Sequence, residues 1–346
     1  MQWLSDWETR WLASELASVR IDRPIFVTGL ARSGTTLLLE LLASVEGVAT
    51  HRYRDFPLLF TPYFWNRYLD WLPVQQEPVE RAHLDGIRIT RESPEAMEEP
   101  LWQAYFPHLH SATSLHRLTE SDRHAVFDRF YLDHLRKLLL IRQGNRYIAK
   151  GNYHIPRIEY LASLLPDARF IIPVRHPLTH IRSLVLQHQL FCNYAATDPR
   201  VPRYLEAAGH FEFGPQRVPI RLDATQGDRI LDAWSRDDSW LGYSIQWAEV
   251  YRFVESLRNT NKQLAARILI VRYEDLCNQP DTTLRRIIDF AELETNAATQ
   301  LFAQLDTVRS MPPAPELPPA LLELIGAEVK SVIGPYGYRL DDCDCF

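Results

Sequence analysis

Short apolar runs alternate with longer helical patterns along this chain. Runs of about four to eight β-branched and aromatic residues are typical of buried strands. Four such runs lie at 25–28, 146–149, 168–174 and 267–271. Apolar residues at helical spacing predict helices over 3–20, 37–45, 121–142, 155–165, 178–190, 236–258 and 320–332. This alternation predicts an α/β fold of three layers, in which helices flank both faces of a central parallel sheet.

The 346 residues could form one large domain or two smaller ones. No clean boundary is visible, so we expect a single α/β domain over 1–346. Residues 50–110 and 192–230 do not follow the alternation and are long enough to be insertions that cover a site. Residues 311–346 form a C-terminal extension that begins with a proline-rich, extended stretch.

Composition narrows the class of protein. The chain has 38 Lys and Arg against 44 Asp and Glu, a net charge of −6, which disfavours a nucleic-acid partner. No run approaches the ~18 to 20 apolar residues that a membrane span needs, and the first residues lack the pattern of a signal peptide. We therefore expect a cytoplasmic protein, with its oligomeric state left open. The four cysteines exclude a disulfide scaffold, and Cys343 with Cys345 makes only half of a metal site.

The loop between the first strand and the next helix carries the clearest chemical signal. Its pattern, Gly-x-x-x-x-Gly-Thr-Thr over 29–36, is P-loop-like except that Thr35 replaces the usual lysine. Backbone N–H groups of such a loop, backed by a helix N-terminus, bind anions. The missing lysine disfavours a nucleoside triphosphate, because that lysine normally reaches its β- and γ-phosphates. Arg32 can supply positive charge instead.

Polar residues also follow the other strands. Lys150, Arg175 and Tyr273 each come at or just after the end of one. Ligands of open parallel sheets bind beyond the carboxyl ends of the strands, so we expect these residues to converge with the loop on an anionic ligand. Pro177 suits the first turn of a helix, which would let Ser183 share one phosphate with Arg175.

Residues 24–39 and 169–183 together resemble the two cofactor motifs of the sulfotransferase family, which uses 3′-phosphoadenosine 5′-phosphosulfate (PAPS). Residues 32–36 resemble its 5′-phosphosulfate loop, especially as found in tyrosylprotein sulfotransferases and their bacterial relatives; they are Arg32, Ser33, Gly34, Thr35 and Thr36. Arg175 and Ser183 resemble the pair that binds the 3′-phosphate. Lys150 occupies the place of a lysine near the transferring sulfuryl group, and 272–276 resembles a motif whose tyrosine, here Tyr273, lies near the cofactor.

The resemblance implies transfer of a sulfuryl group from PAPS to a hydroxyl or amine, with 3′-phosphoadenosine 5′-phosphate (PAP) as product and no metal. The implied acceptor is a small molecule, a carbohydrate or a lipid-like compound. Two alternatives remain open: a small-molecule kinase that uses ATP and Mg²⁺, and a non-catalytic nucleotide-binding protein.

The acceptor-activating base is harder to identify. Tyrosylprotein sulfotransferases carry a catalytic glutamate shortly after the first helix, but residues 50–57 contain none. We favour Asp55, then His51, because the chain returns toward the loop there and both side chains can accept a proton. The remaining candidates lie in 83–99 and are Asp85, Glu95, Glu98 and Glu99. The aromatic run over 53–71 could be a packed core or lid helix, or an acceptor wall.

Overall fold

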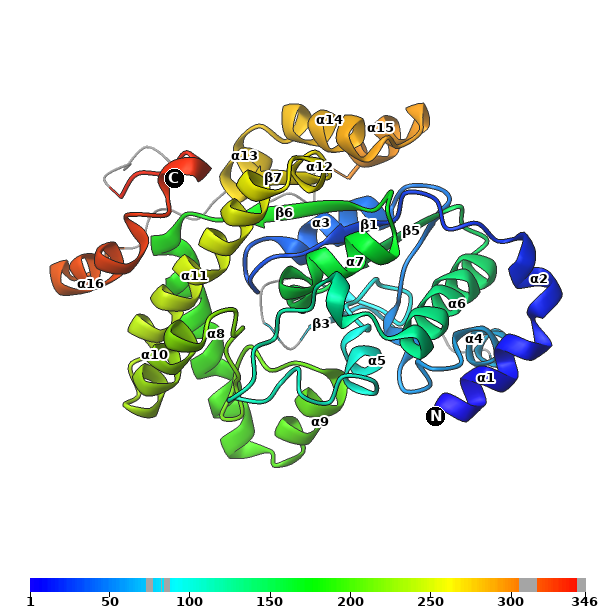
Figure 1. The fold of residues 1–346 in the computed structure, drawn as a ribbon, viewed down its shortest axis with the longest axis horizontal. Coiled ribbons are helices and arrows are strands. Elements are labelled where there is room, and N and C mark those ends of the chain that lie inside the picture. The colour runs from blue at the N-terminus through cyan, green and yellow to red at the C-terminus, as the bar shows by residue number, and fades with distance from the viewer. Residues whose placement is uncertain (73–76, 82, 84–87, 305–315, 341–346) are drawn as a thin grey trace.

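Five parallel strands form the central sheet, in the order β2-β5-β1-β6-β7, and Figure 1 labels the last four of them. The computed structural model describes residues 1–72, 77–81, 83, 88–304 and 316–340. The four predicted strands are all present, and they are neighbours in the sheet. They are β1 (Ile25–Val27), β5 (Arg146–Lys150), β6 (Arg169–Val174) and β7 (Ile268–Arg272). The edge strand β2 (Val48–Ala49) has only two residues, too few for a recognisable pattern.

Side chains alternate between the two faces of the sheet, and each face has its own core. Ile25 and Val27 of β1 point into one core, while Phe26 points into the other. Helices on both faces bury these side chains, which is why the strands read as continuous apolar runs. The first core includes α3 (Thr35–Ala43), α14 (Pro280–Ala291) and α15 (Thr295–Phe302).

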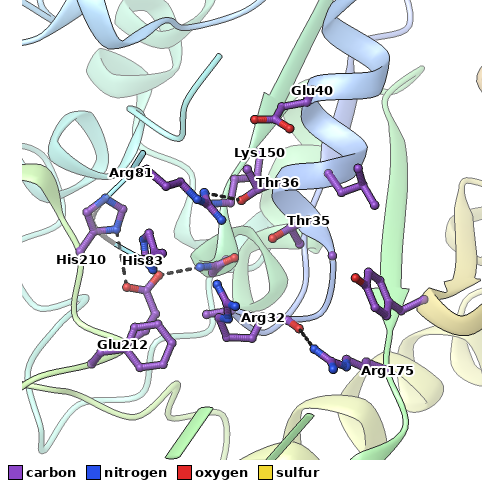
Figure 2. A pocket seen from close by; sticks show the side chains of 16 residues that line it. Arg32, Thr35, Thr36, Glu40, Arg81, His83, Lys150, Arg175, His210 and Glu212 are labelled. Atoms are coloured by element: carbon purple, nitrogen blue, oxygen red, sulfur yellow. Dashed lines mark hydrogen bonds and ion pairs between the residues drawn. The ribbon is translucent and has the colours of Figure 1, made fainter. Parts of the chain in front are cut away.

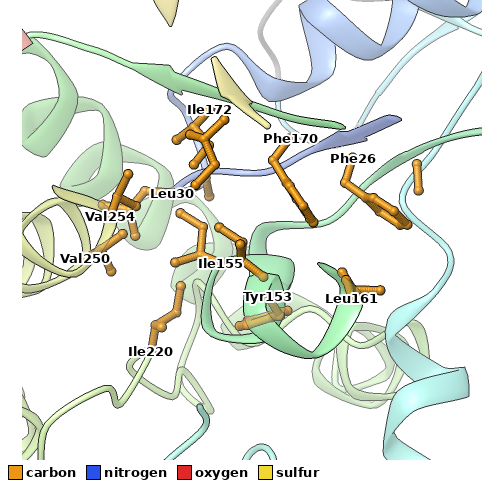
Figure 3. Packing of buried hydrophobic residues seen from close by; sticks show 14 of the residues in the cluster. Phe26, Leu30, Tyr153, Ile155, Leu161, Phe170, Ile172, Ile220, Val250 and Val254 are labelled. Carbon is orange, nitrogen blue, oxygen red and sulfur yellow. The ribbon is translucent and has the colours of Figure 1, made fainter. Parts of the chain in front are cut away.

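The second core is larger. In Figure 3, Phe26 and Phe170 of the sheet face Leu161, and Ile172 lies towards Val250 and Val254. Its helices are α6 (Ala125–Arg142), α7 (Ile158–Leu164), α8 (Pro177–Thr197), α11 (Ser239–Thr260) and α16 (Pro319–Val329). The predicted three-layer α/β architecture is therefore confirmed.

Several short elements complete the described structure. The hairpin of β3 (Val79–Glu80) and β4 (Arg88–Ile89) lies within 50–110. The remaining helices are α1 (Gln2–Trp11), α2 (Ala13–Ser18), α4 (Pro62–Leu69), α5 (Glu99–Gln103), α9 (Arg200–Ala208), α10 (Ala224–Ser235), α12 (Lys262–Ala265) and α13 (Tyr273–Asn278). None of the helices in the described residues is long and apolar enough to cross a bilayer. Asp85, 311–315, Cys343 and Cys345 lie outside the described residues.

The N-terminal helix differs from its prediction. It is broken at Leu12 into α1 and α2. The amphipathic pattern groups Trp7 and Trp11 with the leucines, but the structure buries Leu12 and exposes both tryptophans. The cause is a buried ion pair: Glu8 lies 3.1 Å from Lys137 of α6, so the polar side of α1 turns inward.

Candidate active site

The carboxyl ends of four neighbouring strands meet at one cavity. Lys150 ends β5, Arg175 follows β6, and Tyr273 follows β7. Together with the loop after β1 they border a cavity of about 170 Å³ (Figure 2). The loop contributes Arg32, Gly34, Thr35 and Thr36 to its wall. The convergence expected from the strand order therefore occurs in the structure.

The loop between β1 and α3 has a strained, tightly held backbone. Arg32 and Gly34 have φ angles of 70° and 103°, in the left-handed region. A Cβ on Gly34 would lie 2.6 Å from Cδ2 of Tyr273, so this close approach requires glycine. His180 Nε2 lies 2.9 Å from the Ala31 carbonyl oxygen and fixes the loop from α8. The N-terminus of α3, whose first N–H groups have no helical acceptor, thus opens onto the cavity.

Arg175 closes one side of the cavity. Its guanidinium donates to the Arg32 carbonyl oxygen (3.4 Å) and lies 5.0 Å from the centre of the Tyr273 ring. Ser183 is not part of the cavity wall, but its Oγ accepts a hydrogen bond from Arg32 Nε at 3.3 Å. Ser33 is fully buried behind the loop and also lies outside the wall. Of these residues, Arg32 and Arg175 therefore offer charge directly to a ligand.

Lys150 lies at the opposite side and is almost buried. Its Nζ is 3.7 Å from Glu95 Oε1. Burial raises the pKa of Glu95, but Lys150, His210 and the hydroxyl of Tyr53 outweigh burial and lower that pKa to about 2. Glu95 is therefore ionised and serves as the counter-charge of Lys150.

Asp55 and His51 lie away from the cavity, in a buried polar cluster. Asp55 is fully buried, and its carboxylate accepts hydrogen bonds from Arg142 (2.5 Å), Asn66 (2.8 Å) and the Arg52 backbone (2.9 Å). His51 Nδ1 is 3.1 Å from the same carboxylate. Burial alone would raise the pKa of Asp55, but His51 and Arg142 hold it well below its usual range. This arrangement does not fit an acceptor-activating base, so the structure favours neither residue for that role.

The structure also shows where Glu98, Glu99 and the aromatic residues over 53–71 lie. Glu98 accepts a hydrogen bond from Tyr131 (2.7 Å), and Glu99 pairs with Arg157 (2.7 Å), both in the interior. None of the aromatic residues over 53–71, a range that the structure describes in full, borders the cavity. The acceptor-wall interpretation of that run therefore lacks support.

Several residues of the cavity wall carry no recognisable signal in the sequence. Arg81, next to β3, is 7% exposed and donates to Thr36 Oγ1 at 3.3 Å. Nearby His83 packs 5.2 Å from the ring of Phe191. Burial and the charges of Arg81 and Arg32 lower the pKa of His83 to about 3, so its ring is neutral.

A histidine and a carboxylate form a second unpredicted feature. Gly209, with φ 75°, ends α9 and directs the chain so that His210 and Glu212 reach the cavity. His210 Nδ1 lies 3.7 Å from Glu212 Oε2, while Asn152 Nδ2 donates to Glu212 Oε1 at 2.6 Å. Figure 2 shows both interactions as dashed lines. Asn152 comes two residues after Lys150, so the end of β5 orients the pair. In the sequence, this pair is visible only as a His-x-Glu motif that follows a glycine within the irregular region 192–230.

The surroundings of His210 and Glu212 shift the pKa values of both side chains. Burial lowers the pKa of His210, but the contact with Glu212 outweighs burial and raises it above its ordinary value. Burial raises the pKa of Glu212, but His210 and Asn152 bring it down to about 2. An imidazole whose ring is held by a carboxylate can act as a general base in its unprotonated form.

Comparisons with known proteins show the family and the fold of this chain. The sequence matches the sulfotransferase family over residues 24–208 and 228–297. The comparison with curated proteins finds no match. Sulfotransferase STF9 from Mycobacterium avium is 16% identical, with a TM-score of 0.53; the alignment covers 96% of this chain and 82% of STF9. Sulfotransferase STF1 from Mycobacterium tuberculosis H37Rv is 18% identical, with a TM-score of 0.48, over 96% of this chain and 81% of STF1. STF9 supports the fold, and the family match, which spans most of the sequence, shows that this chain belongs to the sulfotransferase family.

Proposed function

We propose that this sulfotransferase binds PAPS in the cavity and transfers its sulfuryl group to a hydroxyl or amine of a small-molecule, carbohydrate or lipid-like acceptor. The observation that carries the proposal is the convergence of Arg175, Lys150 and the loop over 32–36 on one cavity. PAPS has anionic groups at both the 3′ and 5′ positions. Cations at separate places on the wall suit such a donor better than a single phosphate site would.

The cavity residues fit this donor. Among the described residues, the wall carries four cationic side chains, Arg32, Arg81, Lys150 and Arg175, against the carboxylates Glu40 and Glu212. The N-terminus of α3 adds the positive end of a helix dipole. Because Gly34 has no Cβ, the Tyr273 ring can lie directly against the loop. Both the charge and the shape of this wall therefore suit a polyanionic nucleotide.

Different residues of this chain have different roles in the proposed reaction. When bound, PAPS supplies a sulfuryl group on a phosphate leaving group. Lys150 and the N–H groups at the start of α3 stabilise negative charge that develops beside them. The unprotonated form of the His210 imidazole accepts the proton of the acceptor, and Glu212 stabilises the imidazolium that forms. Phe213 and the neutral His83 add an apolar part to the same wall.

Calorimetry separates this proposal from its alternatives. We expect PAP to bind in the micromolar range or tighter, and ATP with Mg²⁺ to bind far more weakly, because Thr35 replaces the P-loop lysine. Tight binding of ATP–Mg²⁺ without binding of PAP would favour the kinase. Binding of PAP without any turnover of PAPS, across a broad acceptor panel, would favour a non-catalytic nucleotide-binding protein.

The Arg175→Ala variant is expected to bind PAP about 10- to 100-fold more weakly. A hydrogen bond between charged groups contributes roughly 1.5–3 kcal/mol, and this one is proposed to hold the 3′-phosphate. Ser183→Ala should act in the same direction but more mildly, because Ser183 reaches the cavity only through Arg32. Calorimetric titration with PAP measures both effects. Unchanged affinity in both variants would refute the 3′-phosphate assignment.

The Lys150→Ala variant is expected to lower kcat by about 10²-fold while the affinity for PAP changes little. Lys150 is proposed to act where charge develops in the transition state, and removal of such a donor costs about 10²–10³ in rate. Steady-state kinetics and PAP titration measure the two effects separately. The exposed Lys262→Ala is the matched control and should leave both unchanged. Activity within a few-fold of the unmutated protein would make Lys150 a structural partner of Glu95.

The Arg81→Ala variant is expected to weaken binding of PAPS by about 10-fold relative to binding of PAP. Arg81 lies against Thr36 at the start of α3, beside the place proposed for the sulfuryl group, which PAP lacks. Competition binding with both nucleotides gives the ratio of affinities, and Arg88→Ala on the same hairpin is the exposed control. If the ratio stays constant, Arg81 serves the loop and does not contact the sulfuryl group.

A further inference from the structure

Four of the nine tryptophans are largely exposed. Trp3, Trp7, Trp11 and Trp71 are 74, 55, 58 and 81% exposed, respectively. Tryptophan is highly buried on average in folded proteins, and a group of exposed tryptophans differs from the single exposed apolar side chains that are normal on a surface. An exposed group of this kind marks a surface that another molecule covers.

These side chains belong to one continuous surface. Trp3, Trp7 and Trp11 follow one another at one turn each along α1. The rings of Trp7 and Trp11 lie 5.3 and 5.1 Å from Phe64 of α4. Tyr68 lies one turn after Phe64 on α4, Trp71 comes two residues after the end of that helix, and α1 and α4 lie together in Figure 1. We call this surface the aromatic face; it consists of Trp3, Trp7, Trp11, Phe64, Tyr68 and Trp71.

Trp7 and Trp11 pack against α4 with only part of their surface, and the opposite side of α1 also holds the helix, through Ser5 and Glu8. Lys137 of α6 donates to the Ser5 carbonyl oxygen at 3.0 Å and pairs with Glu8. Glu8 also accepts a hydrogen bond from the backbone N–H of Phe64 (2.7 Å). The helix therefore holds its outer tryptophans in fixed positions without burying them.

The size and charge of the aromatic face indicate its occupant. With up to ~250 Å² per tryptophan, the four exposed fractions leave on the order of 700 Å² of aromatic surface. A stable interface between two proteins buries about 800 Å² on each partner. The exposed charges on α1 and α4 and at the end of α4 are balanced: Asp6 and Asp70, the latter paired with Arg54, against Arg10 and Arg67. An anionic membrane would call for an excess of Lys and Arg, whereas a two-fold copy of the same surface offers both signs.

We propose that the aromatic face is the contact surface of a symmetric dimer of this chain. In such a dimer the tryptophans of the two copies pack together, and each arginine faces carboxylates of the other copy. No residue of α1 or α4 is among the described residues that line the cavity, so the contact leaves each cavity open. The proposal is independent of the nucleotide that the cavity binds.

Sedimentation velocity of the full chain, over a micromolar concentration series, tests this proposal. We expect twice the chain mass for the unmutated protein and one chain mass for Trp3→Ser/Trp7→Ser/Trp71→Ser. Leu186→Ser/Leu322→Ser is the matched control, because it removes exposed apolar side chains elsewhere and should remain dimeric. Circular dichroism verifies the fold, and Trp71→Ser alone replaces the triple variant if the latter fails to fold. A monomeric unmutated protein, or a tryptophan variant that stays dimeric, would overturn the proposal.

Two further variants and a lipid assay test the nature of the contact. Arg10→Glu/Arg67→Glu makes the surface uniformly acidic in both copies. We expect it to raise the dimer dissociation constant by at least ~10-fold, with partial recovery at high salt. Dissociation unaffected by this reversal would contradict a self-complementary contact. Cosedimentation of a monomeric unmutated protein with phosphatidylcholine vesicles, lost in the tryptophan variant, would assign the aromatic face to a lipid surface instead.

Discussion

Replacing His210 with alanine is expected to lower kcat by about 10²–10⁴-fold and to leave the affinity for PAP unchanged. This range is typical for removal of a general base. His210 borders the cavity, its ring is held by Glu212, and Glu212 is held in turn by Asn152. Steady-state kinetics with a saturating acceptor, together with PAP titration, measures the two quantities. A His210→Ala variant that keeps its activity would contradict the role of His210 as the base.

The pH dependence gives this assignment a second test. A base works when it is unprotonated, so kcat/KM should rise as pH rises through the pKa of His210, which lies above its ordinary value of about 6.5. Glu212→Gln removes the charge that raises this pKa. Burial then dominates, and the acidic limb of the pH profile should move to lower pH. A limb that does not move would show that His210 is not the titrating group.

Replacing Asp55 with asparagine is expected to reduce the free energy of unfolding by about 3–5 kcal/mol, with little change in kcat per folded molecule. The substitution leaves the buried guanidinium of Arg142 without its counter-charge, and breaking a buried ion pair costs about this much. Urea unfolding at neutral pH measures the loss. Asp70→Asn is the matched control, since its pair with Arg54 is partly exposed and should contribute less than about 1 kcal/mol.

The dependence of the free energy of unfolding on acidic pH tests the structural role of Asp55 independently. The folded state holds the pKa of Asp55 below the unfolded value of about 3.9. Its contribution is therefore complete above that pH and disappears as the pH falls through the folded pKa. The asparagine variant should lack this part of the acid dependence. Loss of transfer in an Asp55→Asn variant that remains as stable as the parent protein would restore Asp55 as the candidate base.

The sequence predicted those parts of the fold and site that depend on neighbouring residues. The four long strands are short apolar runs, and the loop over 29–36 has a distinctive spacing. Lys150 and Arg175 could be assigned to one cavity because the position of a residue at the end of a parallel strand follows from the sheet itself. These predictions required no knowledge of long-range packing.

The remaining parts depend on contacts between distant segments. Asp55 is a plausible base by position, but Arg142, 87 residues later, occupies its carboxylate. His210 and Glu212 reach the cavity only because Gly209 turns the chain after α9. Likewise, Glu8 of α1 faces inward because it forms an ion pair with Lys137 of α6. No local pattern distinguishes such buried charges from ordinary surface charges.

The most direct test of the central claim is transfer of labelled sulfur. The purified protein is incubated with PAPS that carries ³⁵S in its sulfuryl group and with a panel of small-molecule, carbohydrate and lipid-like acceptors; labelled product and PAP are then counted. We predict that label appears in an acceptor in a one-to-one ratio with PAP, without added metal, and that Lys150→Ala slows this transfer. Absence of labelled product across the panel, together with failure of PAP to bind, would contradict the account.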